Sequence, residues 1–333
     1  MSESRALLVD TAQRLFRDLA ASGDQGLPAI WPQIEAAGFP LLLVPEEAGG
    51  FGGDWGDAFA VARLAGLHAL AAPLAEAIVA GWALARGGLP HGDALFAIGA
   101  RADGRLKSGR FTGRVIGAPW GASASHVLVQ FEDRLIRLPL AAATAVETIA
   151  NMAGEPRCGI AFEAAEAEVG EQPADLFGAG ALMRTAQIAG ALDAALELSI
   201  RHANERVQFG RPIAKFQALQ QSLAVLAEEA AAVNCAGQAA ALAADRGDAA
   251  LEIAAAKLRA NQAVGVGVAL AHQAHGAIGF TREHDLHRYT LRLSAWRSEF
   301  GNDRFWSERL GGWVAALGAD GLWAELTRRS DAA

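Results

Sequence analysis

Residues 204–217 read Asn-Glu-Arg-Val-Gln-Phe-Gly-Arg-Pro-Ile-Ala-Lys-Phe-Gln and join two long helical patterns. Neither helix needs the Gly and the Pro in this stretch, so the chain is expected to turn here. The turn places Arg206 at the end of one helix and Gln217 at the start of the next. One interpretation is an ordinary helix corner, because a cation is favoured at a helix C-terminus. The other is a ligand contact, in which the guanidinium meets a phosphate and the amide meets a ring edge.

Residues 273–280 form a second informative stretch and read Gln-Ala-His-Gly-Ala-Ile-Gly-Phe. A helical pattern runs here into small residues, which let a ligand or another backbone approach closely. Taken alone, the stretch predicts a helix C-terminus with Gly276 in the left-handed αL conformation.

The hydrophobic pattern around these stretches divides the chain into three segments. Residues 1–92 predict an N-terminal helical domain, residues 93–172 a small middle β domain, and residues 173–333 a C-terminal four-helix bundle. The expected helices cover about 6–19, 27–37, 57–70, 73–86, 182–206, 216–244, 249–275 and 283–298, with one or two shorter helices within 303–326. The expected strands cover 94–98, 110–116, 126–131, 135–140 and 158–162, with a hairpin turn at Glu132-Asp133. The fold class is therefore mainly α.

Together the two stretches resemble the acyl-CoA dehydrogenase family. In that family the first appears as Arg-x-x-Phe-Gly-x-x-Ile-x-x-Phe-Gln and the second as Gln-x-x-Gly-Gly-x-Gly-Phe. The spacing between the stretches and the helix–β–helix order also fit. Residues 42–53, Leu-Leu-Val-Pro-Glu-Glu-Ala-Gly-Gly-Phe-Gly-Gly, look like a loop of the family's first domain. The resemblance covers most of the chain and is weaker in the middle, where residues 97–104 take the place of a loop that touches flavin and substrate.

The resemblance implies an FAD molecule at a subunit interface. Arg206 would pair with the FAD pyrophosphate, whose geometry a guanidinium matches. Phe209 and Gln217 would contact the cofactor near the same place. From a neighbouring subunit, the other side of the dinucleotide would be lined by Gln273, Gly276 and Ala277. Ala277 stands where the family usually has Gly and adds one methyl group.

The implied reaction is the α,β-dehydrogenation of a CoA thioester. A carboxylate removes the α proton while the β hydrogen leaves as hydride to the flavin. The implied partners are an acyl-CoA substrate and an electron-accepting flavoprotein or a similar acceptor.

The catalytic base of this reaction is not where the family usually has it. Phe300 stands in the usual Glu position, and Glu299 lies one residue earlier, which on a helix is a rotation of about 100°. Some members place the base on the preceding long helix, but the matching positions, near Gly180 and Ala181, hold no carboxylate. Glu299 is therefore the catalytic candidate of this chain, and its alternative role is a structural or solvated carboxylate.

Two hypotheses follow from the empty base positions. The chain is either a complete homo-oligomeric enzyme that uses Glu299 or another carboxylate, or a non-catalytic partner that completes the FAD site of a related chain. The second resembles subunits of hetero-oligomeric acyl-CoA dehydrogenases, in which only one chain brings the base. That group acts on bulky CoA esters such as steroid side chains, so a steroid-type ester is the substrate expected from the resemblance.

The composition excludes other classes of function. The formal net charge of −8 over 333 residues argues against nucleic acid as the main partner. No apolar run is long enough to span a bilayer, and Cys158 and Cys235 suggest neither a disulfide scaffold nor a metal site. The N-terminal residues 1–22 balance their arginines with acidic residues, unlike an import peptide. These features favour a protein of the cytoplasm.

Two histidine pairs have the helical i, i+3 spacing that can place two metal ligands on one face of a helix. They are His272 with His275 and His284 with His287. No cysteine accompanies the pairs, and a Gly-rich turn separates them. Residues 282–288 are better interpreted as the exposed, mixed-charge start of a helix. The sequence therefore predicts no metal site.

Overall fold

The structure is a computed structural model that describes residues 3–23, 26–92 and 94–331. It contains two compact units. The first holds the chain up to Ala62 together with Leu70–Met183, and the second holds Arg63–Ala69 together with the chain from Arg184 onward. The three-domain division at 92/93 and 172/173 stays a prediction, and residue 93 lies outside the described residues.

The helices of the first unit follow the predicted ranges within a few residues. They are α1 (Glu3–Ala21), α2 (Leu27–Ala36), α3 (Trp55–Leu67, up to Ala62 in this unit) and α4 (Leu74–Arg86), with short 3₁₀ turns at Phe39–Leu41 and Glu46–Ala48. Pro28 occupies the first turn of α2, where a missing N–H breaks no helical hydrogen bond. Most side chains of α4 are buried, which fits its nearly unbroken apolar sequence.

The β region of the first unit contains two four-stranded sheets within the described residues. One has the order β1-β4-β5-β8 and the other β2-β3-β7-β6. The strands are β1 (Phe96–Ile98), β2 (Arg101–Lys107), β3 (Arg110–Pro119), β4 (His126–Phe131), β5 (Arg134–Pro139), β6 (Ala143–Ala150), β7 (Pro156–Glu166) and β8 (Glu168–Val169). The inward residues of both sheets form one apolar core around Phe111, Val129 and Ile160.

Three strands of the first unit, β2, β6 and β8, lie outside the predicted strands, and all three are mostly exposed. β1 and β2 together cover all but two residues of the segment 97–104, which the resemblance predicts to be a loop, so only residues 99 and 100 connect the two strands. The residues of β2 alternate little between apolar and polar, and β6 is mostly exposed along its length. A strand without a buried face has no period-two pattern to detect. The hairpin turn at Glu132-Asp133 is confirmed, with Phe131 opposite Arg134.

Phe111 should contribute measurably to the stability of the β region. Its side chain is fully buried and makes edge-to-face contacts with Phe131 (centroids 5.3 Å apart) and Phe162 (6.2 Å). Phe111→Leu keeps an apolar side chain but loses both aromatic contacts, so we expect a loss of about 1–2 kcal/mol of unfolding free energy. The measurement is urea unfolding beside Phe51→Leu, whose side chain is 59% exposed and which should change stability little. Equal losses in both variants would contradict the assigned core.

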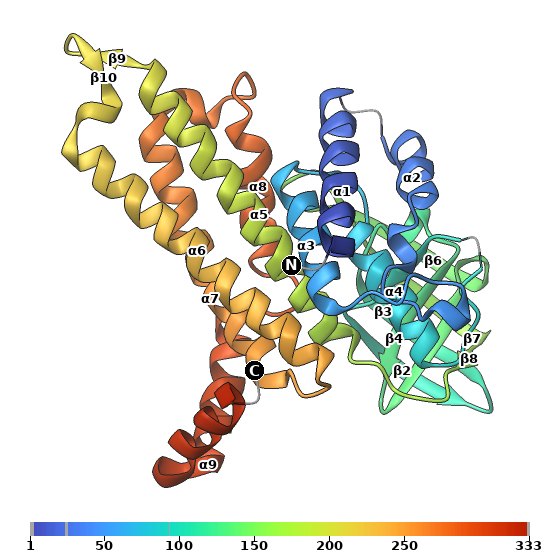
Figure 1. Ribbon diagram of the computed structural model, residues 1–333. Helices are drawn as coiled ribbons and strands as arrows, with labels where there is room; N and C mark the ends of the chain where they lie inside the picture. Colours follow the sequence, from blue (N-terminus) through green and yellow to red (C-terminus); the bar gives the residue numbers. More distant parts are fainter. Residues whose placement is uncertain (1–2, 24–25, 93, 332–333) are drawn as a thin grey trace. The chain divides into compact units, whose positions relative to one another are not determined.

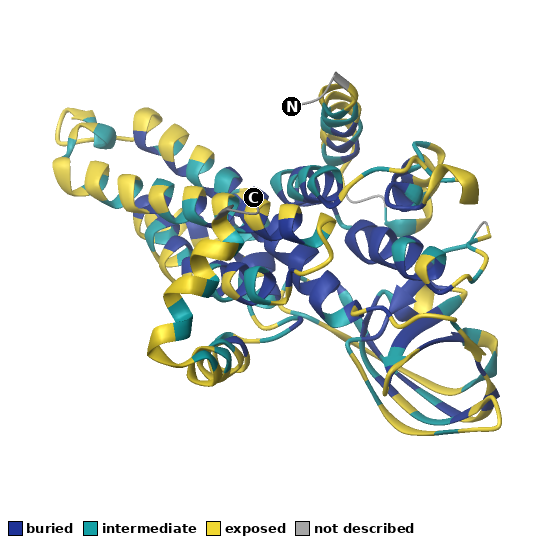
Figure 2. Cartoon of the chain, turned by 60° about the horizontal axis from the view of Figure 1, so that its bottom comes forward, coloured by how far each residue is buried: buried dark blue, intermediate teal, exposed yellow. Residues whose placement is uncertain are grey.

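The second unit is helical and contains the predicted bundle. Its helices are α5 (Leu176–Glu205, from Arg184 in this unit), α6 (Gln217–Asp245), α7 (Ala250–His275), α8 (Leu286–Trp296) and α9 (Asp303–Asp331). α6 and α7 pack side by side along their length (Figure 1). The inner faces of the long helices are buried, whereas the end that carries residues 207–212 is exposed (Figure 2).

Two helix predictions in this unit need correction. The helix expected over 283–298 begins at Leu286 and ends at Trp296, so residues 297–300 form a turn. The helix in the C-terminal stretch runs to Asp331, with non-helical backbone angles at Gly318. A helix that spans a bilayer would need about 20 apolar residues, and no helix within the described ranges meets that requirement.

Candidate functional site

The corner at residues 204–217 is a small hairpin rather than a plain turn. Residues Val207–Gln208 (β9) pair antiparallel with Arg211–Pro212 (β10). Phe209 and Gly210, between them, have φ angles of +52° and +78°. Two positive φ values in a two-residue loop are the signature of a type I′ turn, in which Gly is favoured. The glycine that neither helix needed is thus required by the hairpin.

Three predicted cofactor residues are exposed on this corner. The Arg206 side chain is exposed, follows directly after α5, and has no carboxylate within 4.0 Å among the described residues. Phe209 is 91% exposed at the turn, and Gln217 is the first residue of α6. The hairpin holds Arg206 in place because the Arg206 N–H donates to the His202 carbonyl (2.9 Å) and its carbonyl accepts from the Ile213 amide (2.9 Å). An exposed, unpaired guanidinium on a fixed backbone suits an anionic ligand.

The second stretch is also exposed at its predicted positions. Gln273, Gly276 and Ala277 are exposed at the end of α7 and in the following 3₁₀ helix, Gly276–Phe280. Gly276 has φ +65° and ψ −146°, so the expectation of an αL cap is wrong, although its positive φ still favours Gly. A Cβ at Gly276 would meet nothing within 4 Å, so the backbone here is open to an approaching molecule.

Comparisons with known proteins connect these segments to a family. Residues 172–305 match the family model of the acyl-CoA dehydrogenase C-terminal domain. The acyl-CoA dehydrogenase IpdE2 of Mycobacterium tuberculosis is 31% identical over 82% of this chain and 83% of its own length.

The chain belongs to the acyl-CoA dehydrogenase family.

Solved structures show the same fold. A variant of the Tcur3481-Tcur3483 steroid ACAD superposes with a TM-score of 0.86 at 23% identity, over 94% of this chain and 98% of that one. The ChsE4-ChsE5 complex from Mycobacterium tuberculosis gives a TM-score of 0.83 at 22% identity, over 95% and 98% of the two chains. The mainly α architecture with a small β region and C-terminal helices is therefore confirmed as that of the acyl-CoA dehydrogenases.

Glu299, the candidate base, lies in a turn and is paired with a buried arginine. Because α8 ends at Trp296, the expectation of a helical rotation between Glu299 and Phe300 does not apply. The Glu299 carboxylate lies 2.9 Å from the guanidinium of Arg184, whose side chain is 3% exposed. The same guanidinium lies over the Trp296 ring (5.4 Å) and the Phe300 ring (5.7 Å). A carboxylate held in this way balances a buried charge.

Phe300, which the resemblance places at the usual base position, is buried in this turn. Its side chain is 6% exposed and its φ is +52°, which is uncommon for a residue other than Gly. Its carbonyl accepts a hydrogen bond from the indole N–H of Trp306 (3.0 Å), which fixes the turn. The alternative base positions, Gly180 and Ala181, are buried on α5 and carry no side-chain acid.

A fully buried lysine holds the same turn from α7. The Lys257 ammonium donates to the carbonyls of Trp296 (3.3 Å), Arg297 (3.2 Å) and Gly301 (3.2 Å) and to the side-chain oxygen of Asn261 (2.5 Å). Burial is the main cause that lowers the pKa of Lys257 to about 7; the nearby Arg184 charge acts in the same direction, whereas Glu299 raises the pKa. Lys257 therefore caps the end of α8 and fixes the segment that carries Glu299.

Arg184 and Lys257 are not among the site residues predicted from the sequence, although the sequence carries one signal for Lys257. Ile253, Lys257, Asn261 and Val264 recur at helical spacing on the buried face of α7. A lysine on an otherwise apolar face is rarely buried without partners, so it could have been flagged as the centre of a polar network.

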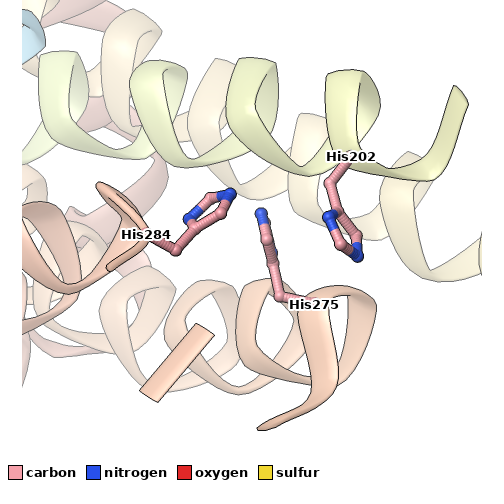
Figure 3. A group of neighbouring side chains, drawn as sticks. All are labelled: His202, His275 and His284. Atoms are coloured by element: carbon pink, nitrogen blue, oxygen red, sulfur yellow. The ribbon is translucent and has the colours of Figure 1, made fainter. Parts of the chain in front are cut away.

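The histidines gather in a combination that sequence spacing did not indicate. His202 on α5, His275 at the end of α7 and His284 in the turn before α8 bring their rings together (Figure 3). His272 stacks instead on the Phe280 ring, with centroids 4.0 Å apart, and His287 bonds through Nδ1 to the His284 carbonyl (2.7 Å). Residues 281–285 form a turn rather than a helix start, and His284 is half-buried. Neither of the two spaced pairs that the sequence suggested is the group that forms.

Proposed function

We propose that this chain is a FAD-binding subunit of an acyl-CoA dehydrogenase that catalyses α,β-dehydrogenation of a CoA thioester. Family membership supports the reaction and the cofactor, because FAD-dependent oxidation of CoA thioesters is the family's chemistry. FAD, when bound, accepts the hydride from the β carbon. Side chains must bind the cofactor and remove the α proton. The described residues suit the first task better than the second.

The cofactor residues fit an interfacial site. Arg206 would hold the pyrophosphate, with Phe209 and Gln217 beside it on the corner. Gln273, Gly276 and Ala277 of a second chain would line the opposite side of the dinucleotide. Exposure of these residues in the isolated chain supports the proposal, because groups of a shared site are covered only after association.

The proton-transfer step is assigned to a second, related chain. The observation that carries this assignment is the ion pair between Glu299 and the buried Arg184. A general base must reach the substrate proton, and the Glu299 carboxylate is already engaged by a buried guanidinium. The same observation favours the second candidate function, a non-catalytic partner that completes the FAD site or scaffold of the catalytic chain.

The substrate and surroundings are proposed from the relatives. One structural neighbour is a steroid ACAD and another is a complex of two chains, ChsE4-ChsE5. We propose a bulky, steroid-type CoA ester as substrate, a hetero-oligomer as the working form, and the cytoplasm as its location. An electron-transferring flavoprotein structure is also among the structural neighbours, which supports a flavoprotein as the electron acceptor.

The test is to express the chain alone and together with a related acyl-CoA dehydrogenase chain, and to record the visible spectrum of each preparation. Flavin that appears only in the co-expressed assembly, and is bleached by a bulky acyl-CoA, supports the proposal. If the chain alone binds flavin and an acyl-CoA bleaches that flavin, the assignment of the base to a partner chain is wrong. An assembly that binds no flavin would reject the FAD site itself.

Glu299→Gln should leave turnover nearly unchanged in the active assembly. We expect a change below about threefold, whereas loss of a general base lowers the rate by about 100-fold or more. The variant should unfold more readily, because the buried Arg184 guanidinium loses its counter-charge. Steady-state kinetics and thermal unfolding on the same preparation separate the two effects. Glu308→Gln, on the exposed face of α9, is the matched control. A collapse of turnover with unchanged stability would make Glu299 the base.

A further inference from the structure

The three histidines of Figure 3 lie on separate elements and meet ring to ring. The rings of His202 and His275 stack with centroids 4.6 Å apart, and those of His275 and His284 meet at 4.5 Å with an angle of 67°. One nitrogen from each ring lies within 4.8 Å of the others. The fold thus brings three imidazole rings together from α5, α7 and the turn at 281–285, and the contacts of each ring indicate what the group can bind.

His275 is the central member, and its free nitrogen has no partner. Its Nδ1–H donates to the Ala271 carbonyl (2.8 Å), which leaves the lone pair on Nε2. The side chain is 6% exposed, and Nε2 is buried without a hydrogen bond among the described residues. A buried acceptor without a donor is destabilising. A ring oriented by a backbone carbonyl through one nitrogen, with the other nitrogen open, is the usual state of a metal-binding histidine.

Burial shifts the pKa of two of the three rings, those of His275 and His202, in the direction of the neutral form. Burial is the main cause that lowers the pKa of His275 to about 4; the hydrogen bond to the Ala271 carbonyl raises the pKa, and the neighbouring histidines lower it. Burial also lowers the pKa of His202, with contributions from His284 and Arg206 in the same direction and from Glu205 in the opposite one. Neutral imidazole is the form of histidine that binds metal ions.

We propose that His202, His275 and His284 form a binding site for a divalent transition-metal ion, with Zn²⁺ as the ion that fits best. Three imidazoles with an open fourth position are a known zinc donor set. Imidazole also suits Co²⁺, Ni²⁺ and Cu²⁺, and disfavours Mg²⁺ and Ca²⁺, which take oxygen ligands. The proposal does not rest on the proposed dehydrogenase function.

A modest closure would bring the ligands to bonding distance. Zn–N bonds of about 2.0–2.1 Å in a tetrahedron put ligand nitrogens roughly 3.3 Å apart, so the rings must approach by about 1.5 Å. His202 and His275 are fixed on long helices, whereas His284 lies in a turn that can adjust. His202 and His284 are half-buried, so the group lies next to solvent.

His284 must also change its hydrogen bonding. Its Nδ1 accepts from the Leu286 amide (3.1 Å) at the start of α8. Binding through Nε2 moves the ring proton to Nδ1, and binding through Nδ1 uses that lone pair, so either mode replaces this bond. One backbone hydrogen bond is a small loss against three metal–nitrogen bonds. Binding would then tie α5, α7 and the turn before α8 together.

The experiment titrates the full-length, tag-free protein, treated with a chelator and dialysed, with Zn²⁺ in a calorimeter. Co²⁺ absorption serves as a second readout, because tetrahedral cobalt is intensely coloured. We expect one ion per chain, a higher unfolding temperature with zinc, and Kd values raised by about tenfold or more in His202→Ala, His275→Ala and His284→Ala. The matched control is His287→Ala, whose ring lies outside the group, and it should bind like the wild type.

Circular dichroism of each variant identifies any that fail to fold, and His202→Ala, at a half-buried position, keeps the test decisive if His275→Ala does not fold. The site is rejected if the wild type binds no stoichiometric zinc, if the folded single variants bind as tightly as the wild type, or if His287→Ala loses binding as they do. A visible cobalt spectrum that disappears in folded His202→Ala supports it.

Discussion

Replacing Arg206 with glutamine should remove most of the flavin from the protein while leaving its helices intact. The guanidinium is exposed and pairs with no carboxylate among the described residues. Its removal therefore leaves no described carboxylate without its ion-pair partner. In the proposed site it meets the FAD pyrophosphate, and truncation of one partner of a desolvated charge pair costs about 2–4 kcal/mol. That corresponds to about 30-fold to 1,000-fold weaker FAD binding.

The measurement is the flavin content of the purified assembly, with calorimetric titration of FAD into the stripped protein. Arg201→Gln is the matched control, because Arg201 is an exposed arginine on the same helix, outside the corner. It should retain the wild-type flavin content, and both variants should unfold at the wild-type temperature. Full flavin content in Arg206→Gln would show that the arginine only ends α5, which is the plain helix-corner interpretation.

Stability should rise steeply with pH from about 7 towards 10 because of Lys257. The pKa of Lys257 is about 7 in the folded protein and about 10.5 in the unfolded chain. The unfolded state therefore binds more protons than the folded state between about pH 7 and pH 10. The free energy of unfolding therefore increases with pH, by at most about 1.4 kcal/mol per pH unit for one proton. The stabilisation is complete above the unfolded pKa and lost as the pH falls through the folded value.

Lys257→Met should remove this slope, because the variant has no proton to exchange at that position. Urea unfolding at several pH values between 7 and 9.5 measures it, below the range in which Tyr289, with its raised pKa, titrates. The variant should also be less stable at high pH, since the carbonyls that the amine contacts lose a donor. Lys107→Met, on an exposed strand, should keep the wild-type slope. A wild-type curve that is flat over this range would mean that Lys257 keeps its ordinary pKa in the folded protein, and it would contradict the lowered pKa.

The helices and the cofactor corner were accessible from the sequence because their signals are local. Apolar residues at helical spacing marked α5, α6 and α7, and the motif around Arg206 and Gln217 carried the family resemblance. The strands β2 and β6 were missed because an exposed edge has no alternating pattern. The end of α8 was placed two residues late, since the signal that stops the helix is not local. It is the ammonium of Lys257, which binds the last carbonyls from another helix.

The site was predicted in part for the same reason. The positions of Arg206, Phe209 and Gln217 follow from consecutive residues, and their cofactor roles stay predictions. The sequence also predicts that the usual base is missing, because Phe300 stands where the resemblance implies Glu, and this stays a prediction. The ion pair of Glu299 with Arg184 could not be predicted from the sequence, because the two residues are 115 positions apart in the chain.

The sequence by itself determined the mainly helical class, the small β region, the family and the residues expected to bind FAD. Each of these follows from hydrophobic periodicity or from short sequence motifs, which reflect backbone geometry and local contacts. Only the tertiary structure decided that Glu299 is held by a buried arginine, that Lys257 caps α8, and that His202 joins His275 and His284. These three arrangements join side chains from helices and turns far apart in sequence. Their partners are selected by burial, since a charge or an imidazole that loses water must find its counterpart wherever the fold brings one.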